Sequence, residues 1–241
     1  MKIAVITLAT NKYKIFLHPL WKSINQYFIP HVQKDFYFFT DERMDWFDDS
    51  VKWFPIKHEP WPYITLKRFE FISQCLKDLT HYDYVFYIDS DIEFVDTLQN
   101  FDIRGKKYYA VCHPSVVNNL NFWPVETNSA STAYIPERHR CVYVQGCMWG
   151  AVGSSIEHMV NTMKNNVDAD LKNNIIAVWH DESHLNKFIV DHRNESAVLT
   201  PSLAYPENWN LPVNKLAIHK DKNMVEYPRF SGAGNNQQEH N

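Results

Sequence analysis

Two aspartates separated by one residue, Asp89 and Asp91, are the groups whose spacing first suggests chemistry. They directly follow residues 85–88, a short run of β-forming residues of the kind found in buried strands. Ligands of open α/β sheets bind at the carboxyl ends of the strands, and carboxylate oxygens suit Mg²⁺ or Mn²⁺ ions that also hold substrate phosphates. One interpretation is therefore a metal clamp for a nucleotide diphosphate. The alternative is a turn in which either aspartate caps a following helix.

A second polar cluster, W-H-D-E-S-H-L-N-K-F, occupies residues 179–188 and allows three interpretations. Asp181 as a helix N-cap, with Glu182 in the first turn where the helix dipole favours negative charge, needs no chemistry. His180 and His184 stand four residues apart, as the zinc-binding histidines of H-E-x-x-H do, but Asp181 replaces the glutamate of that motif. In the third interpretation, Glu182 is a catalytic carboxylate that faces a sugar and is kept ionised by the helix start.

The elements that must position these groups alternate along the chain. Strands are predicted at residues 3–8, 36–40, 51–56, 85–88, 107–112, 142–152, 196–200 and 215–219, and helices at residues 16–28, 66–76, 156–165 and 179–190. This alternation predicts a single α/β domain with a mainly parallel sheet. His113, just after one strand, is either a hydrogen-bonded structural residue or part of a site at the sheet edge. Residues 115–140 show little periodicity and are predicted to be a long functional excursion over the surface.

Composition excludes several classes of protein. The 241 residues carry a formal net charge of −4 without a Lys/Arg-rich block, so no nucleic-acid partner is indicated. No apolar stretch reaches 18 residues and the N-terminus lacks the features of a signal peptide, so we expect a cytoplasmic protein without a transmembrane anchor. Residues 1–229 are predicted to form the domain, and residues 230–241, which lack core-forming side chains, a disordered tail.

Four stretches, occurring in this order, together resemble glycosyltransferase family 6: D-S-D-I-E-F at 89–94, H-P at 113–114, A-Y-I-P at 133–136 and W-H-D-E-S-H-L-N-K at 179–187. The family includes the blood-group A and B transferases, the α-1,3-galactosyltransferases and the Forssman synthase, with bacterial and phage relatives. The resemblance implies a GT-A fold, a single Rossmann-like domain with a mainly parallel mixed sheet. It also implies retaining transfer of GalNAc or Gal from a UDP-sugar to O3 of an acceptor galactoside, such as a galactose-terminated, blood-group-H-like oligosaccharide. The missing Golgi anchor suggests a bacterial or phage member.

The resemblance also implies roles for individual residues. Asp89 and Asp91 would hold Mn²⁺, or Mg²⁺, against the UDP pyrophosphate, Glu182 would be the catalytic carboxylate, and Arg68 would reach the donor sugar and the second aspartate. The other implied donor contacts are Leu8, Ala9, Thr10 and Tyr13 at the uracil, Ser90 at the ribose, Asp181 and Gly146 at the sugar, and Lys222 at the diphosphate, with Lys220 as its rival. The implied acceptor contacts are His113, Val144 and Trp179.

Members of the family differ at two positions that affect the chemistry. Many bacterial members have N-x-N in place of D-x-D and need no metal, so the two aspartates of this chain predict metal dependence. Gly146 stands where blood-group A transferase has Gly and B has Ala; room for an acetamido group favours UDP-GalNAc, unless the neighbouring Gln145 fills that room. The rival class is a non-catalytic carbohydrate-binding protein on the same fold. It would be marked by loss of the metal-binding or catalytic carboxylates, and all three are present.

Overall fold

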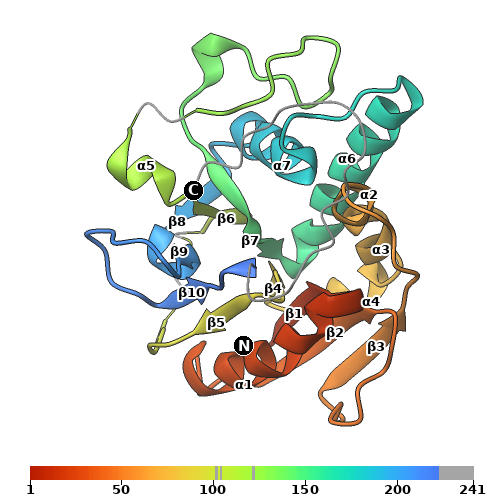
Figure 1. The fold of residues 1–241 in the computed structure, drawn as a ribbon, viewed down its shortest axis with the longest axis vertical. Coiled ribbons are helices and arrows are strands. Elements are labelled where there is room, and N and C mark those ends of the chain that lie inside the picture. Colours follow the sequence, from red (N-terminus) through yellow and green to blue (C-terminus); the bar gives the residue numbers. More distant parts are fainter. Residues whose placement is uncertain (101–102, 104, 121–122, 223–241) are drawn as a thin grey trace.

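A seven-stranded sheet forms the centre of the molecule. The computed structural model describes residues 1–100, 103, 105–120 and 123–222. The strands lie in the order β3-β2-β1-β4-β7-β6-β8 (Figure 1). Their bounds are Ile3–Leu8 (β1), Lys34–Thr40 (β2), Val51–Pro55 (β3), Tyr84–Ile88 (β4), Tyr108–Cys112 (β6), Val144–Val152 (β7) and Ser196–Leu199 (β8). Neighbouring strands are parallel except where β7 runs antiparallel to β4 and β6. The predicted mainly parallel mixed sheet of a GT-A-like α/β fold is confirmed.

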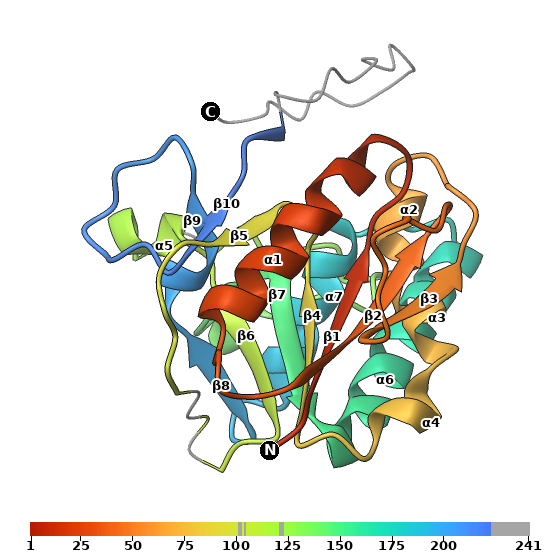
Figure 2. The same ribbon diagram turned by 90° about the horizontal axis from the view of Figure 1, so that it is seen from below.

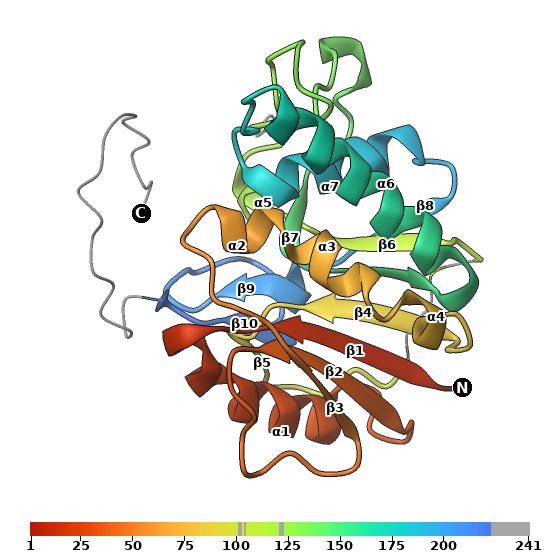
Figure 3. The same ribbon diagram turned by 90° about the vertical axis from the view of Figure 1, so that its right-hand side faces the viewer.

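Helices cover both faces of this sheet. α1 (Leu17–Tyr27) packs on the face to which Ile3 and Val5 contribute. α3 (Arg68–Ser73), α6 (Gly153–Lys172) and α7 (His180–Asp191) pack on the face of Ala4 and Ile6 (Figure 3). A strand that is buried on both faces needs apolar residues at successive positions, and residues 3–6 are all fully buried. This explains why the continuous apolar runs predicted β1 and β4 well.

Short elements were predicted less well. The helix expected at residues 66–76 is three short helices, α2 (Tyr63–Leu66), α3 and α4 (Leu76–Leu79), whereas α6 is twice as long as the predicted helix at 156–165. β5 (Ile92–Phe94), β10 (Ala217–His219) and β9 (Tyr205–Pro206) form a second sheet in that order, of which only β10 was expected. The described residues also form three 3₁₀ helices: η1 (Asn11–Phe16), η2 (Glu137–His139) and η3 (Pro201–Ala204).

The predicted excursion is tied to the domain by buried polar groups. It contains α5 (Ser115–Asn118) and η2, and between them Glu126 accepts hydrogen bonds from the backbone N–H groups of Asn128 and Val178, both at 2.7 Å. The Ser131 hydroxyl donates to the buried Asp170 of α6 at 2.5 Å. The excursion is therefore partly buried against α6 and the segment before α7, not laid over the surface as expected.

Two sequence-based predictions fall partly or wholly outside the described residues. The proposed tail at residues 230–241 and the boundary at residue 229 both lie beyond residue 222. Within the described part of the chain, no helix has the length and apolarity required to cross a membrane.

One edge of the central sheet gathers the ends of elements from the whole chain. β1, β4 and β6 end there, and the antiparallel β7 begins there, so Leu8, Ile88, Cys112 and Val144 mark the same edge (Figure 2). Gly150 lets β7 pack this closely, because a Cβ at that position would lie 2.0 Å from the Val85 carbonyl oxygen.

Candidate active site

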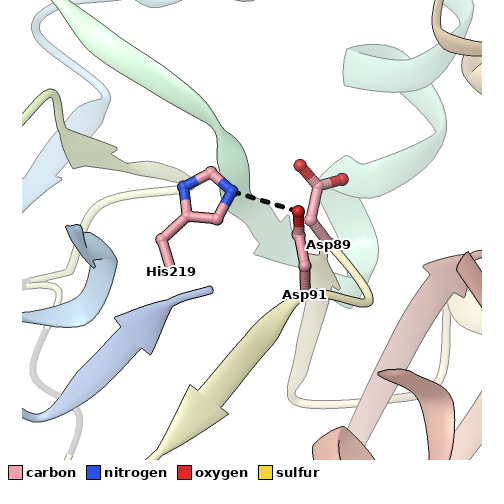
Figure 4. A group of neighbouring side chains, drawn as sticks. All are labelled: Asp89, Asp91 and His219. Atoms are coloured by element: carbon pink, nitrogen blue, oxygen red, sulfur yellow. Dashed lines mark ion pairs between the residues drawn. The ribbon is translucent and has the colours of Figure 1, made fainter. Parts of the chain in front are cut away.

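Three metal-ligating side chains meet at this edge. Asp89 and Asp91 follow β4, and His219 ends β10; one ligand atom of each lies within 4.8 Å of those of the other two (Figure 4). The antiparallel pairing of β10 with β5 places His219 opposite Ile92, directly beside Asp91. Carboxylate oxygens and an imidazole nitrogen form a donor set suited to Mn²⁺ and similar divalent ions.

Asp91 has the properties of a residue built to hold a cation. Its side chain is 2 % exposed, and Oδ2 lies 3.4 Å from His219 Nε2 and 3.3 Å from Lys222 Nζ. Among the described residues, however, neither Asp91 Oδ2 nor His219 Nε2 makes a hydrogen bond of normal geometry. Burial opposes ionisation of Asp91, but the positive charges of Lys222 and His219 outweigh it and hold the pKa of this carboxyl well below its usual range. These orphaned buried atoms fit a divalent ion at the D-x-D pair.

A buried arginine connects this pair to the second polar cluster. Arg68, the first residue of α3, lies 3.5 Å from Asp89 Oδ1 and 3.1 Å from Asp181 Oδ2, and it donates a hydrogen bond to the Gly146 carbonyl at 3.1 Å. Its guanidinium stacks over the Tyr87 ring, 4.5 Å from the centroid. The arginine therefore contacts the first aspartate of the motif, whereas the resemblance implied the second.

Glu182 faces β7 from the first turn of α7. Its Oε1 accepts a hydrogen bond from the Tyr143 hydroxyl at 2.5 Å, and its Oε2 accepts one from the Gly146 backbone N–H at 2.8 Å. Burial raises the pKa of Glu182 to about 7, although these two hydrogen bonds act to lower it. Burial likewise raises the pKa of Asp181 to about 6 against the charge of Arg68. Perturbed carboxyl groups that converge in this way are typical of functional sites.

The helix-cap interpretation of residues 179–188 is correct for Glu182, which lies in the first turn of α7, but wrong for Asp181. The zinc-site interpretation is wrong. α7 begins at His180 after Trp179, and no side chain among the described residues caps it; Asp181 lies in the first turn and pairs with Arg68 instead. His184 is fully buried 3.7 Å from Asp170, while the ring of His180 lies edge-on against Trp61 at 4.6 Å. The two histidines thus have separate surroundings, and the described residues form no three-ligand metal group around them.

Most residues predicted for the nucleotide lie at the end of β1 or in η1, near the D-x-D pair. Leu8, Ala9 and Thr10 follow one another at the end of β1, with the Thr10 hydroxyl 2.8 Å from His58 Nδ1. Tyr13 in η1 lies under Lys222, whose Nζ is 5.9 Å from the ring centroid, and Ser90 is buried beside Asp91. A cavity of about 230 Å³ is lined in part by Phe16, Ser90, Asp91 and Lys220, so Ser90 and Asp91 are the predicted donor-site residues that face it.

The structure distinguishes the two candidate lysines. Lys222 Nζ lies 3.3 Å from Asp91, whereas the ammonium of Lys220 forms ion pairs with Glu207 and Glu93. Lys220 is therefore engaged away from the D-x-D pair. Lys222 is the lysine that faces it.

The predicted acceptor residues are brought to the same side of the molecule, but not equally. The ring centroids of His113 and Tyr143 lie 5.4 Å apart, and burial lowers the pKa of His113 to about 4. Trp179 is 40 % exposed immediately before α7. Val144 is fully buried in the core cluster, so its side chain offers no surface to an acceptor in this arrangement.

Sequence reasoning missed His219 and Tyr143 as members of the site. His219 is 128 residues from Asp91 in the chain, and only the register of β10 with β5 brings them together. Tyr143 precedes β7, where an aromatic residue is unremarkable as a core side chain. The expected contact of Gly146 with the donor sugar gave an indirect hint, because Tyr143 lies only three residues before it in the chain.

A GT-A-like domain with an acidic D-x-D pair at the end of a central strand, and with a buried arginine–carboxylate network beside it, defines the class: a glycosyltransferase that uses a nucleotide-sugar donor and a glycan acceptor. Comparison with known sequences agrees with the class and narrows it. The chain belongs to glycosyltransferase family 6, whose family description matches residues 1–226. The resemblance inferred from the sequence is confirmed.

Individual relatives show how the similarity is distributed. The chain is 27 % identical to the O-antigen biosynthesis glycosyltransferase WbnI of Escherichia coli, over 92 % of this chain and 95 % of that protein. It is 27 % identical to the globoside alpha-1,3-N-acetylgalactosaminyltransferase 1 of Gallus gallus, over 94 % of this chain and 69 % of the relative. It is 26 % identical to the histo-blood group ABO system transferase 2 of Rattus norvegicus, over 89 % of this chain and 67 % of the relative. Similarity along nearly the whole bacterial relative agrees with the expected bacterial or phage type.

Proposed function

We propose that this enzyme is a metal-dependent, retaining α-1,3-glycosyltransferase that moves GalNAc or Gal from a UDP-sugar to O3 of an acceptor galactoside. One observation carries the proposal: Glu182, held by Tyr143 and Gly146, lies next to the Asp181–Arg68–Asp89 chain of ion pairs. A carboxylate for the sugar and a carboxylate pair for the diphosphate are thus joined by one buried cation. Names of relatives that contain "alpha-1,3-N-acetylgalactosaminyltransferase" support the linkage.

Each charged group of the site has a separate role in the proposed reaction. A divalent ion bound by Asp89 and Asp91 would neutralise the negative charge that develops on departing UDP. Lys222, which already faces Asp91, would add a second positive charge on the same side. Glu182 must be ionised to serve the anomeric carbon, either by attacking it or by stabilising an oxocarbenium ion; both retaining routes require this charge. Arg68 lies between Asp181 and Asp89 and compensates the negative charge of both.

The proposed donor is UDP-GalNAc rather than UDP-Gal. A Cβ at Gly146 would meet Glu182 Cβ at 3.4 Å and Asp181 Oδ2 at 3.5 Å, so the missing methyl leaves space beside the two carboxylates. Gln145, its neighbour in β7, points to the other side of the strand, because its Nε2 lies 3.2 Å from His219 Nδ1. Gln145 therefore does not fill the space at Gly146, which supports room for an acetamido group.

The test is a UDP-release assay with UDP-GalNAc, UDP-Gal, UDP-Glc and UDP-GlcNAc, each with a galactoside acceptor and with or without Mn²⁺. The expected result is acceptor-dependent release with one of the first two donors, most rapidly with UDP-GalNAc. Glu182→Gln should lower turnover by about 10²-fold or more, equivalent to about 2.7 kcal/mol of transition-state stabilisation. No release with any donor would instead support a carbohydrate-binding protein on the same fold.

Thermal unfolding of the same variant separates catalysis from structure. A carboxyl whose folded-state pKa is raised destabilises the folded state as pH rises through that pKa. The melting temperature of Glu182→Gln at pH 8 should therefore equal or exceed that of the wild type. A lower melting temperature with unchanged turnover would reduce Glu182 to a structural residue.

A further inference from the structure

The side chain of His219 points at the D-x-D pair from a separate sheet (Figure 4). Its Nε2 lies 3.4 Å from Asp91 Oδ2, and neither atom makes a normal hydrogen bond within the described residues. Two ligand atoms that each sit about 2.1 Å from one ion, at angles near 90–110°, are about 3.0–3.5 Å apart. The spacing of these two atoms is therefore that of neighbouring ligands on one cation.

We propose that His219 Nε2 is the third protein ligand of the divalent ion, and that the Gln145 amide fixes the tautomer of His219 that makes this possible. The proposal deepens the proposed function by assigning the protein ligand set of its metal. It extends the D-x-D pair by a nitrogen donor from the small β5-β10-β9 sheet.

Gln145 can support His219 in two protonation patterns. In one pattern the amide Nε2–H donates to His219 Nδ1, at the observed 3.2 Å, and the ring proton sits on Nε2 toward Asp91. In the other, the amide is rotated by 180° so that Oε1 accepts from Nδ1–H, and the Nε2 lone pair is free for a cation. The neutral ring keeps one proton in both patterns; it moves from Nε2 to Nδ1, and no net proton is released. Metal-binding histidines are commonly fixed in this way by an acceptor on the other ring nitrogen.

A simpler alternative assigns His219 only the role of a positive counter-charge for Asp91. The two roles predict opposite effects of removing the ring. A counter-charge competes with the metal for Asp91, so its removal would leave Mn²⁺ binding unchanged or stronger. A ligand contributes directly, so its removal weakens binding.

Metal preference adds a second distinction. Imidazole nitrogen favours transition ions such as Mn²⁺ over Mg²⁺, whose preferred ligands are carboxylate oxygen and water. Loss of a nitrogen ligand should therefore weaken Mn²⁺ more than Mg²⁺. Loss of a counter-charge should affect both ions alike.

The experiment is Mn²⁺ titration of the full chain by electron paramagnetic resonance, without nucleotide or acceptor, followed by competition with Mg²⁺. The wild type should show ¹⁴N modulation of the Mn²⁺ spin echo. His219→Ala should remove this modulation and weaken Mn²⁺ binding by about tenfold or more, with a smaller effect on Mg²⁺ binding. Gln145→Leu leaves no acceptor for the His219 Nδ1–H group and should weaken Mn²⁺ binding by about tenfold. Gln145→Glu supplies a carboxylate that can only accept from Nδ1–H, so this variant should bind Mn²⁺ at least as tightly as the wild type. Melting temperatures of all variants, with His219→Asn as a second ring deletion, establish that each is folded.

His158→Ala is the matched control. This exposed histidine on α6 pairs with His192 and packs near Tyr108, at the opposite edge of the sheet, so its removal should not change Mn²⁺ binding at the D-x-D pair. Absence of ¹⁴N modulation in the wild type, unchanged or tighter binding in His219→Ala, or no Mn²⁺ binding at all would each overturn the proposal. Because no sugar donor is present, these outcomes are independent of whether the chain transfers a sugar. Lost nitrogen coordination in His219→Ala would stand even if every donor failed.

Discussion

The hydrogen bond from Tyr143 to Glu182 allows the ionisation of the proposed catalytic carboxylate to be tested directly. Tyr143→Phe removes only the hydroxyl that donates to Glu182 Oε1 at 2.5 Å and keeps the ring that packs against His113. Burial raises the pKa of Glu182 to about 7, and the Tyr143 hydrogen bond opposes that rise. The substitution should therefore raise the pKa further.

The size of the shift follows from the strength of the bond. A hydrogen bond to a charged group contributes about 1.5–3 kcal/mol, and part of it persists when the carboxyl is protonated. About 1.4 kcal/mol of difference between the two protonation states corresponds to one pKa unit. We therefore expect the acidic limb of the kcat/KM profile to move from about pH 7 to about pH 8, which lowers the ionised fraction at pH 7 from about one half to about one tenth. The rate should fall about fivefold at pH 7 and approach that of the wild type by pH 9, because the active form is the ionised one.

The assay is UDP release between pH 6 and pH 9, with Tyr82→Phe as the control. Tyr82 donates a hydrogen bond of the same kind to Asp35 at 2.5 Å, far from the candidate site, so its loss should change the melting temperature without moving the profile. An unmoved acidic limb in Tyr143→Phe would refute the assignment of this ionisation to Glu182. An equal loss at every pH would leave Tyr143 with an orienting role only.

Three further outcomes are expected. EDTA should abolish transfer and Mn²⁺ should restore it, while Asp91→Asn should lower turnover by orders of magnitude; full activity in EDTA would exclude a metal role. Gly146→Ala should leave the fold intact, since the contacts of the added methyl are ordinary, but should reduce the UDP-GalNAc rate about tenfold relative to UDP-Gal, and an unchanged donor ratio would contradict the proposed pocket. A chain ending at residue 220 lacks Lys222 and should remain folded but bind UDP more weakly by calorimetry; equal affinity would remove Lys222 from the donor site.

Much of the fold was predictable because its strands are buried on both faces. β1 and β4 read as unbroken β-forming runs, and β4 leads directly into the D-x-D pair, so its position at the sheet edge followed from the topology of α/β proteins. The carboxylates of α7 were also predictable as a group, since polar residues clustered at a predicted helix start. Their roles were not, because helix position alone made Asp181 a cap, whereas Arg68 from α3 holds it instead.

What could not be predicted depends on long-range register and on buried polar pairs. α6 extends past the predicted residue 165 because Asp170, a polar residue at a buried position, is compensated by Ser131 from the excursion, and no local pattern reveals that partner. β5 and β9 are too short to produce a periodic signal, yet β5 sets the position of β10. The third candidate metal ligand, His219, could therefore be identified only from the pairing of β10 with β5 in the structure.

The candidate site joins residues held by two different sheets. Asp89, Gly146 and Glu182 are held by the central sheet and α7, where Arg68 and paired backbone groups fix their separation. His219 and Lys222 come instead from β10 and the segment after it, and their side chains reach Asp91 and Gln145 from outside the central sheet. A bound cation and diphosphate would contact Asp89 of the first group, which the central sheet and Arg68 already hold, and both residues of the second group. Donor binding should therefore protect residues 217–222 from hydrogen exchange more than β4 or β7, and equal protection of both groups would show that the site is already fully assembled without ligand.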